Sequence, residues 1–171
     1  MTQRALIIGV EHYLDADISR VPHAESDAVA FSEAIQAHGF DVSNLLLLLN
    51  AAATKTQADH RIDRFLQGVT QDDTLFVYFA GQGVSADGRN YLLCHDSVPT
   101  QAEKTGIALG PLLTNMQDSP CQRIAFFLDG SHGDTLDEGE LDAFVQASPF
   151  HVAFSACSTD ETSHAHDGLG R

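Results

Sequence analysis

The chain has 171 residues, of which 43% are hydrophobic and 19% are charged, a size and composition typical of one folded globular domain that exclude disordered and fibrous proteins. Nine Lys and Arg against 24 Asp and Glu give a formal net charge of −15, which disfavours nucleic acid and anionic membranes as partners and favours basic ligands or peptides. The longest apolar run, Leu45–Leu49, is far shorter than a membrane span of roughly 20 residues, and residues 1–4 show no signal-peptide pattern. We therefore expect a single cytoplasmic domain over residues 1–171 with a polar tail from about residue 158.

The cysteines are three in number, and Cys94, Cys121 and Cys157 lack the spacing of a metal site. An odd number of cysteines predicts reduced, buried thiols rather than a disulfide framework. No group of residues has a convincing zinc spacing, so we expect no metal and no cofactor.

The apolar residues alternate between short continuous runs and segments of helical period, a pattern typical of a parallel sheet covered by helices. The expected strands are, in chain order, 5–10, 42–49, 74–79, 123–128 and 151–156. The expected helices are 24–38, one that begins at Thr54 or Thr56 and continues to about residue 69, 111–116, and one within 135–146. Their expected inward residues are Ala28, Phe31 and Ile35, then Ile62, Phe65, Leu66 and Val69, then Leu141, Phe144 and Val145. Residues 90–94 are expected to form a small hairpin outside the main sheet.

Three of the expected strands end in loops of small and polar residues. Because ligands bind at the carboxyl ends of the strands in open α/β sheets, Gln82, Ser131 and Ser155 are predicted to share one rim. Ser131 with His132 and Asp129 also suggests a serine hydrolase. However, neighbours on a turn rarely face one another as a triad requires, and Asp and Ser in turns commonly bond loop backbone.

Six segments carry a resemblance to a known family, and they occur in the family's order along nearly the whole chain. They are Ala-Leu-Ile-Ile-Gly-Val at 5–10, Glu-Ser-Asp-Ala at 25–28, the strand ending in Ala-Gly-Gln-Gly at 80–83, Asn-Tyr-Leu-Leu at 90–93 with the aspartate at 96, Leu-Asp-Gly-Ser-His-Gly at 128–133, and 155–163. The sequence resembles the caspase-like cysteine peptidases, closest to the metacaspase and prokaryotic caspase branch. This resemblance implies a three-layer α/β/α sandwich with the strand order 2-1-3-4-5.

Two substitutions separate this chain from active members of the family it resembles. The resemblance places Gln82 at the position of the general-base His and Ser131 at the position of the nucleophilic Cys, with Gly83 and Gly130 near the oxyanion hole. A glutamine amide does not take up a proton near neutral pH, and a serine hydroxyl is a poor nucleophile without a base. We therefore expect the domain to be catalytically inactive as it stands.

The resemblance also implies an acidic pocket for an Arg or Lys side chain, with Asp27 and Asp129 as its carboxylates. Ala80 takes the place of a serine in that pocket, and Ser155 lies at the end of the fifth strand. Asp160 is expected to lie in a solvated acidic tail, and its alternative role is contact with a basic peptide or a calcium ion. Calcium is implied only by analogy with calcium-activated metacaspases. The structural alternative for Asp27 is a carboxylate favoured by the dipole of its helix.

The family domain continues with a further helix and a sixth, antiparallel strand, so the resemblance implies that this chain lacks both and leaves its fifth strand at an edge. Two functions remain open. One is a pseudopeptidase that binds a basic peptide, a protein partner, or a C-terminal fragment or second chain that completes the sheet. The other is an Arg/Lys-specific cysteine endopeptidase in an inactivated form, natural or engineered.

Overall fold

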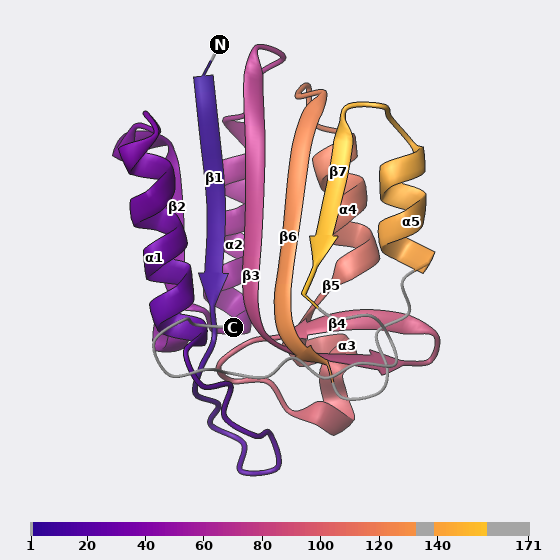
Figure 1. Cartoon of the computed structure of the whole chain (residues 1–171). Helices are drawn as coiled ribbons and strands as arrows, with labels where there is room; N and C mark the ends of the chain where they lie inside the picture. Colours follow the sequence, from indigo (N-terminus) through magenta and orange to yellow (C-terminus); the bar gives the residue numbers. More distant parts are fainter. Residues whose placement is uncertain (1, 133–138, 157–171) are drawn as a thin grey trace.

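The computed structural model of the chain describes residues 2–132 and 139–156, with the side chains at 131 and 132 excepted. Its centre is a sheet whose five parallel strands lie side by side (Figure 1). They are, in spatial order, β2 (Leu45–Leu49), β1 (Thr2–Gly9), β3 (Asp73–Ala86), β6 (Arg123–His132) and β7 (His151–Ser155). Counting only these strands, the order is 2-1-3-4-5, which confirms the expected topology.

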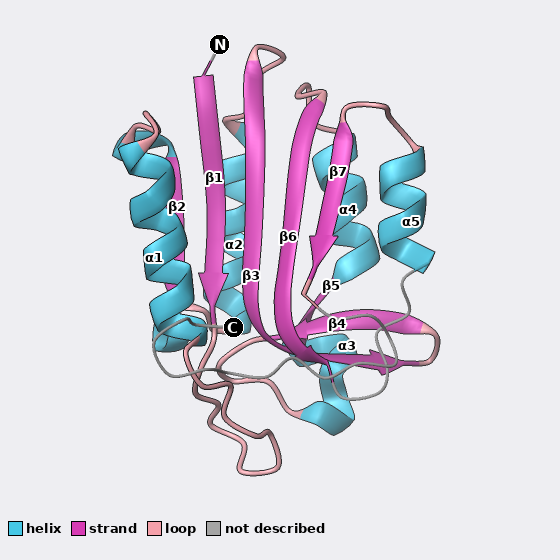
Figure 2. Ribbon diagram, viewed as in Figure 1, coloured by secondary structure: helices cyan, strands magenta, loops and turns pink. Residues whose placement is uncertain are grey.

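Helices cover both faces of the sheet but not equally (Figures 1 and 2). Of the described helices, one face packs against α1 (Ala24–Ala37), whereas the other packs against α2 (Lys55–Gln67), α4 (Leu109–Gln117) and α5 (Gly139–Gln146). Each strand supplies both layers because its side chains alternate, so Ile7 of β1 faces α1 while Ile8 lies in the core beneath α2. The three-layer α/β/α fold is therefore as expected. None of the described helices is long and apolar enough to cross a lipid bilayer.

Most of the short elements lie near the carboxyl ends of the parallel strands, where β4 and β5 pair antiparallel beside the end of β3. These elements are η2 (Asn50–Ala52), β4 (Arg89–Leu93), η3 (Pro99–Gln101), α3 (Ala102–Thr105) and β5 (Gly106–Ala108), whereas η1 (Val42–Asn44) precedes β2 at the other end of the sheet. The sequence pattern did not predict α3 or β5, which are only 4 and 3 residues long.

Two central strands run further than the sequence predicts. The expected strand ends after Phe79 and Leu128 are wrong, because β3 continues to Ala86 and β6 to His132. In this extension the backbone of β3 still pairs with β6 on one side and gains β4 on the other, so mostly small and polar residues remain in the ladder without a continuous apolar run. The expected hairpin at 90–94 is therefore part of the same sheet, joined to it through β3.

Two further expectations require correction. Residues 42–44 form a 3₁₀ turn rather than strand, because the Asp41 carboxylate accepts a hydrogen bond from the Ser43 N–H at 2.8 Å. Val145 of α5 is 38% exposed rather than inward, because Leu141 and Phe144 occupy the face of α5 that meets the sheet.

The cysteines at 94 and 121 are free and buried, as expected, while Cys157 lies outside the described residues. Burial raises the pKa of the Cys94 thiol to about 12, so this sulfur stays protonated at neutral pH. Cys94 is therefore a packing residue and not a nucleophile.

Candidate functional site

The extended ends of β3 and β6 place two candidate residues next to each other. The parallel register pairs Gln82 with Ser131, and its flanking pairs are Ala80 with Asp129, Gly81 with Gly130, and Gly83 with His132. Adjacent strands lie about 4.8 Å apart, so the backbones of Gln82 and Ser131 are direct neighbours. The rim predicted from the strand ends therefore exists at these two strands.

Gln82 is half-buried, and a hydrogen bond to its backbone N–H fixes its position. Its N–H donates a hydrogen bond to the Tyr13 hydroxyl at 2.7 Å, and the Tyr13 hydroxyl in turn donates to the Val10 carbonyl at 3.1 Å. The side-chain amide of Gln82 makes a long contact, 3.5 Å from its Nε2 to the Ser19 carbonyl. Tyr13 thus links the loop that follows β1 to the site through hydrogen bonds. Sequence reasoning did not predict this role of Tyr13.

Gly81 is required by this close packing. A Cβ atom at Gly81 would lie 2.9 Å from the Phe79 ring and 3.0 Å from the Tyr13 hydroxyl. Any side chain would therefore push Tyr13 away from the Gln82 N–H. This glycine keeps β3 and the loop after β1 in contact.

Asp129 supplies the acidic group on β6. The Tyr78 hydroxyl donates a hydrogen bond to Asp129 Oδ2 at 3.0 Å, whereas Asp129 Oδ1 is buried and has no hydrogen-bond partner in the part of the chain that the structure describes. A buried acceptor without a donor costs free energy, roughly 1–3 kcal/mol. Hydrogen bonding of the Asp129 carboxyl group is thus incomplete among the described residues.

Asp27 lies on the same side of the sheet as Asp129. It is half-buried in the first turn of α1, and Phe31, one turn later on the same helix face, stacks on Tyr78 with ring centroids 4.6 Å apart. Since Tyr78 bonds Asp129, a continuous path of contacts connects this face of α1 to the acidic group of β6. Ala80 is fully buried between the strand partners Gly9 and Asp129.

The remaining predicted site residues are placed differently. Ser155 pairs with Leu128, three residues before Ser131 and roughly 10 Å from it along the strand, so the expectation that it lies level with Gln82 and Ser131 is wrong. The reason is that β7 begins opposite Ile124 and is only 5 residues long. Gly83 and Gly130 lie in the ladder beside the central pair. Asp160 lies outside the described residues.

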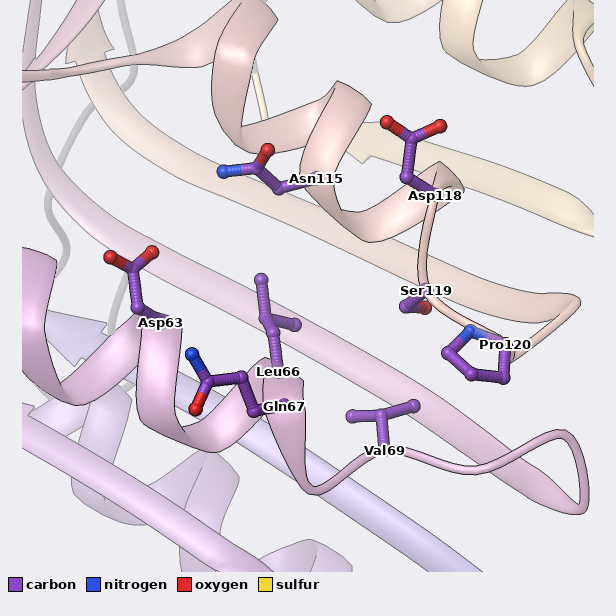
Figure 3. A pocket seen from close by; sticks show the side chains of 8 residues that line it. All are labelled: Asp63, Leu66, Gln67, Val69, Asn115, Asp118, Ser119 and Pro120. Carbon is purple, nitrogen blue, oxygen red and sulfur yellow. The ribbon is translucent and has the colours of Figure 1, made fainter.

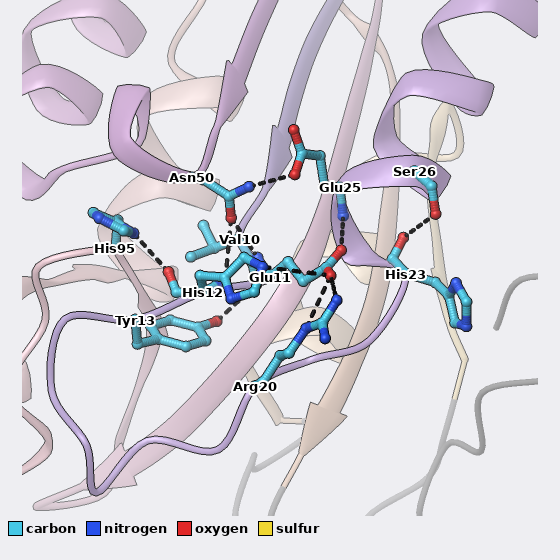
Figure 4. A network of polar contacts seen from close by, with 10 residues as sticks. All are labelled: Val10, Glu11, His12, Tyr13, Arg20, His23, Glu25, Ser26, Asn50 and His95. Carbon is cyan, nitrogen blue, oxygen red and sulfur yellow. Dashed lines mark hydrogen bonds and ion pairs between the residues drawn. The ribbon is translucent and has the colours of Figure 1, made fainter.

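A polar network surrounds Glu11 beside the site (Figure 4). Sequence reasoning did not predict it. Glu11 is only 7% exposed and accepts a hydrogen bond from Arg20 Nε at 3.0 Å and from the Glu25 N–H, at the start of α1, at 3.3 Å. Burial acts to raise the pKa of this carboxyl, but the bonds and charge of Arg20 together with the Glu25 N–H outweigh it and hold the pKa below the ordinary value of 4.5.

Asn50 joins this network to the end of β2. Its side-chain oxygen accepts hydrogen bonds from the N–H groups of Glu11 and His12 at 2.9 and 3.1 Å, and its amide nitrogen donates to Glu25 at 2.6 Å. Asn50 adopts a positive φ of 43°, which asparagine tolerates better than most residues. The network thus fixes the start of α1, which carries Asp27, against the ends of β1 and β2 (Figure 4).

A separate hollow of about 390 Å³ lies between the carboxyl ends of α2 and α4 (Figure 3). Its lining residues are Asp63, Leu66, Gln67, Val69, Asn115, Asp118, Ser119 and Pro120. These residues precede the starts of β3 and β6, so the hollow is at the opposite end of the sheet from Gln82 and Ser131. The described residues contain no group of three or more His, Cys, Asp or Glu side chains that could hold a metal ion.

Comparison with known proteins agrees with this architecture. The model of the caspase domain, a peptidase family, matches residues 2–170. Among solved structures, protein GSU0716 from Geobacter sulfurreducens superposes with a TM-score of 0.70 at 15% identity, covering 99% of this chain and 78% of that one. Pro-sf-caspase-1 superposes with a TM-score of 0.60 at 18% identity, covering 80% of this chain and 48% of that one, so the match spans about half of that protein. No curated protein matches the sequence.

Proposed function

The chain belongs to the caspase domain family, and from this premise we propose that it is a pseudopeptidase that binds a basic peptide or protein partner without cleaving it. The proposed binding site is formed by the carboxyl ends of β3 and β6 together with the start of α1. The proposed ligand is a segment that presents an arginine or lysine side chain.

The observation that carries this proposal is the register of β3 and β6. It makes Gln82 and Ser131 direct neighbours, as a base and a nucleophile must be, yet neither residue supplies the required chemistry. Cysteine peptidases need an imidazole to accept a proton and a thiolate to attack, and an amide beside a hydroxyl offers neither. If these are the positions of the family's dyad, loss of both groups removes most of the catalytic power and leaves at best what binding and backbone donors contribute.

Binding has its own support, because the acidic groups do not depend on the dyad. Asp129 presents a buried oxygen atom without a described donor, and Asp27 lies on the same side of the sheet. A guanidinium group can donate two parallel hydrogen bonds to a carboxylate, which gives both affinity and selectivity for arginine. The formal charge of −15 adds a long-range attraction for a basic ligand.

The test compares the natural chain with the double variant Gln82→His, Ser131→Cys on fluorogenic peptides that carry Arg, Lys or Asp before the scissile bond. We expect no cleavage by the natural chain and cleavage after Arg or Lys by the double variant. The single variants Gln82→His and Ser131→Cys are the controls, and each should stay inactive because base and nucleophile act as a unit. Cleavage by the natural chain would contradict the proposal.

Binding is measured separately, by titrating the natural chain with a fluorescent, uncleavable peptide that has one arginine. Asp129→Asn should weaken this binding by tenfold or more, because an amide cannot form the charged bidentate pair. A matched change at the exposed, distant Asp118→Asn should leave it within twofold. Equal affinity for arginine and glutamate peptides would exclude a basic-residue pocket.

A further inference from the structure

The strand β2 lies at one end of the strand order, beside α1 and α2 (Figure 1). Within the described residues β2 pairs only with β1, and the backbone groups of residues 46–48 make no hydrogen bond there except to β1. Successive residues of a strand direct their N–H and C=O groups to alternate sides, so part of these groups faces outward. Natural edge strands usually carry charged residues, proline or bulges, yet β2 consists of five leucines. This edge is therefore open to a further strand.

The flank of α2 beside this edge carries two arginines. Arg61 and Arg64 are each two residues from a side chain that lines the hollow between α2 and α4, namely Asp63 and Leu66. Residues two apart on a helix lie on nearly opposite sides, so both arginines lie on the side of α2 away from α4 and toward β2. Both are exposed, and neither makes a hydrogen bond or ion pair with a described residue, whereas Lys55 of the same helix is paired with an aspartate. They are thus available to an acidic ligand.

The flank of α1 on the other face of the sheet is apolar beside this edge. Phe31 contacts Tyr78 of β3 and Phe127 of β6, so Val29, two residues earlier, lies on the opposite side of α1, toward β2. Val29 is half-buried. The leucines of β2 that face α1 are half-buried too, whereas those beneath α2 are buried; the half-buried ones are Leu45, Leu47 and Leu49. An added strand would cover these partly exposed apolar side chains.

The two flanks together indicate which segment fits. Because the side chains of a strand alternate between two faces, a strand added to β2 would direct every second side chain toward Arg61 and Arg64 and the others toward Val29. We propose that β2 accepts, as an added strand, an extended segment of a partner protein in which acidic and apolar residues alternate. A second copy of this chain fits less well. Antiparallel pairing of two β2 strands about a twofold axis would place both α2 helices, with their arginines, on the same face of the joined sheet, and two formal charges of −15 repel each other.

The experiment uses a fluorescent, end-blocked peptide of seven residues with alternating Val and Glu, titrated into the full chain and followed by anisotropy. At physiological salt, charges more than about 8 Å away are largely screened, so the nearby arginines dominate. We expect the double variant Arg61→Gln, Arg64→Gln to weaken binding by fivefold or more, and unchanged binding would overturn the proposal. Arg89→Gln is the matched control and should stay within twofold, because Arg89 is an exposed arginine of β4 that also makes no hydrogen bond or ion pair with a described residue. Circular dichroism and Tm confirm that each variant is folded.

Two further peptides separate strand addition from simple charge attraction. The first has the same sequence and charge but is N-methylated at every residue, so it cannot donate backbone hydrogen bonds to β2. The second replaces each Glu with Lys. Loss of binding with both supports the proposal, and binding of either with the affinity of the Val-Glu peptide overturns it.

The other possible occupant and the proposed arginine pocket are tested separately. Sedimentation velocity of the chain without peptide reports its oligomeric state. A dimer that dissociates as the Val-Glu peptide binds would assign the edge to a second copy and overturn the proposal. Asp129→Asn should weaken the proposed arginine pocket and leave binding of the Val-Glu peptide within twofold, so the two surfaces can fail independently.

Discussion

The face of the sheet that packs against α1 has two halves, and they differ sharply in burial. In the half formed by β1 and β3, Ala5 and Ile7 are 0% exposed because α1 covers them. In the other half it is β7 that lacks a helix: Val152 and Phe154 are 44% and 56% exposed on the same face, whereas Phe127 of β6 still contacts Phe31 of α1. Apolar residues on a strand therefore indicate a buried position only where a helix covers them. The candidate residues Gln82 and Asp129 lie on β3 and β6, at the boundary of the two halves.

The largest effect should come from truncating the covered half. Ile7→Ala removes a fully buried side chain between β1 and α1, and the resulting cavity should cost about 2–5 kcal/mol in the free energy of unfolding. Urea unfolding followed by circular dichroism measures this loss. A cost below about 1 kcal/mol would mean that α1 does not cover this half in solution. The difference in burial between the two halves would then not hold.

The close approach of α1 to β1 gives the next prediction. A Cβ atom at Gly9 would lie 2.7 Å from Ala28 Cβ and 2.8 Å from the Ala24 carbonyl oxygen, so Gly9→Ala must push the helix away and should cost about 1–3 kcal/mol. Gly68→Ala is a matched control, because its nearest neighbour, at 3.0 Å, is the flexible end of the Arg4 side chain. Equal unfolding free energies for the two variants would contradict the tight packing inferred at Gly9.

The network of Glu11 anchors the start of α1 and should make the covered half sensitive to acid. Because the pKa of Glu11 is lower in the folded chain than its ordinary value of 4.5, the unfolded chain binds this proton more readily, and the stabilisation is present above pH 4.5 and lost as the pH falls below it. Glu11→Gln cannot titrate, so the difference in unfolding free energy between the natural chain and the variant should shrink on acidification from pH 6 to pH 3. The natural chain's other acids titrate in both proteins and largely cancel in this difference. A difference that stays constant with pH would contradict the assigned role of Glu11.

The arrangement of the main strands could be predicted because it depends on local pattern. Runs such as Leu45–Leu49 are apolar throughout, as strands covered on both faces must be, and the intervening helices carry apolar residues at helical spacing. The ends of β3 and β6 could not be predicted in this way. Beyond Phe79 and Leu128 the ladder is held by backbone hydrogen bonds to neighbouring strands, and no continuous apolar run marks that continuation.

The candidate site was predictable to the same limited extent. Parallel strands end at the same edge, which was enough to bring Gln82 and Ser131 together. The contacts that hold the site connect residues distant in sequence, such as the Gln82 N–H with the Tyr13 hydroxyl and the Tyr78 hydroxyl with Asp129. Neither pair has a spacing that a sequence pattern reveals. Glu11 was missed for the same reason, since a lone acid after a strand does not show that an arginine and a helix start will surround it.

The smallest effect should come from the uncovered half, and it completes the comparison with Ile7. Phe154→Ala removes a larger side chain than Ile7→Ala does, yet more than half of the phenylalanine is already in water, so the stability lost is mainly its stacking on Phe127. An aromatic pair of this kind contributes about 0.5–1.5 kcal/mol, and we expect Phe154→Ala to lie near the lower end of that range. Urea unfolding of Phe154→Ala and Ile7→Ala under one set of conditions gives the two losses of unfolding free energy for direct comparison. If Phe154→Ala cost as much as Ile7→Ala, Phe154 would be covered in solution and the difference in burial between the two halves would not hold.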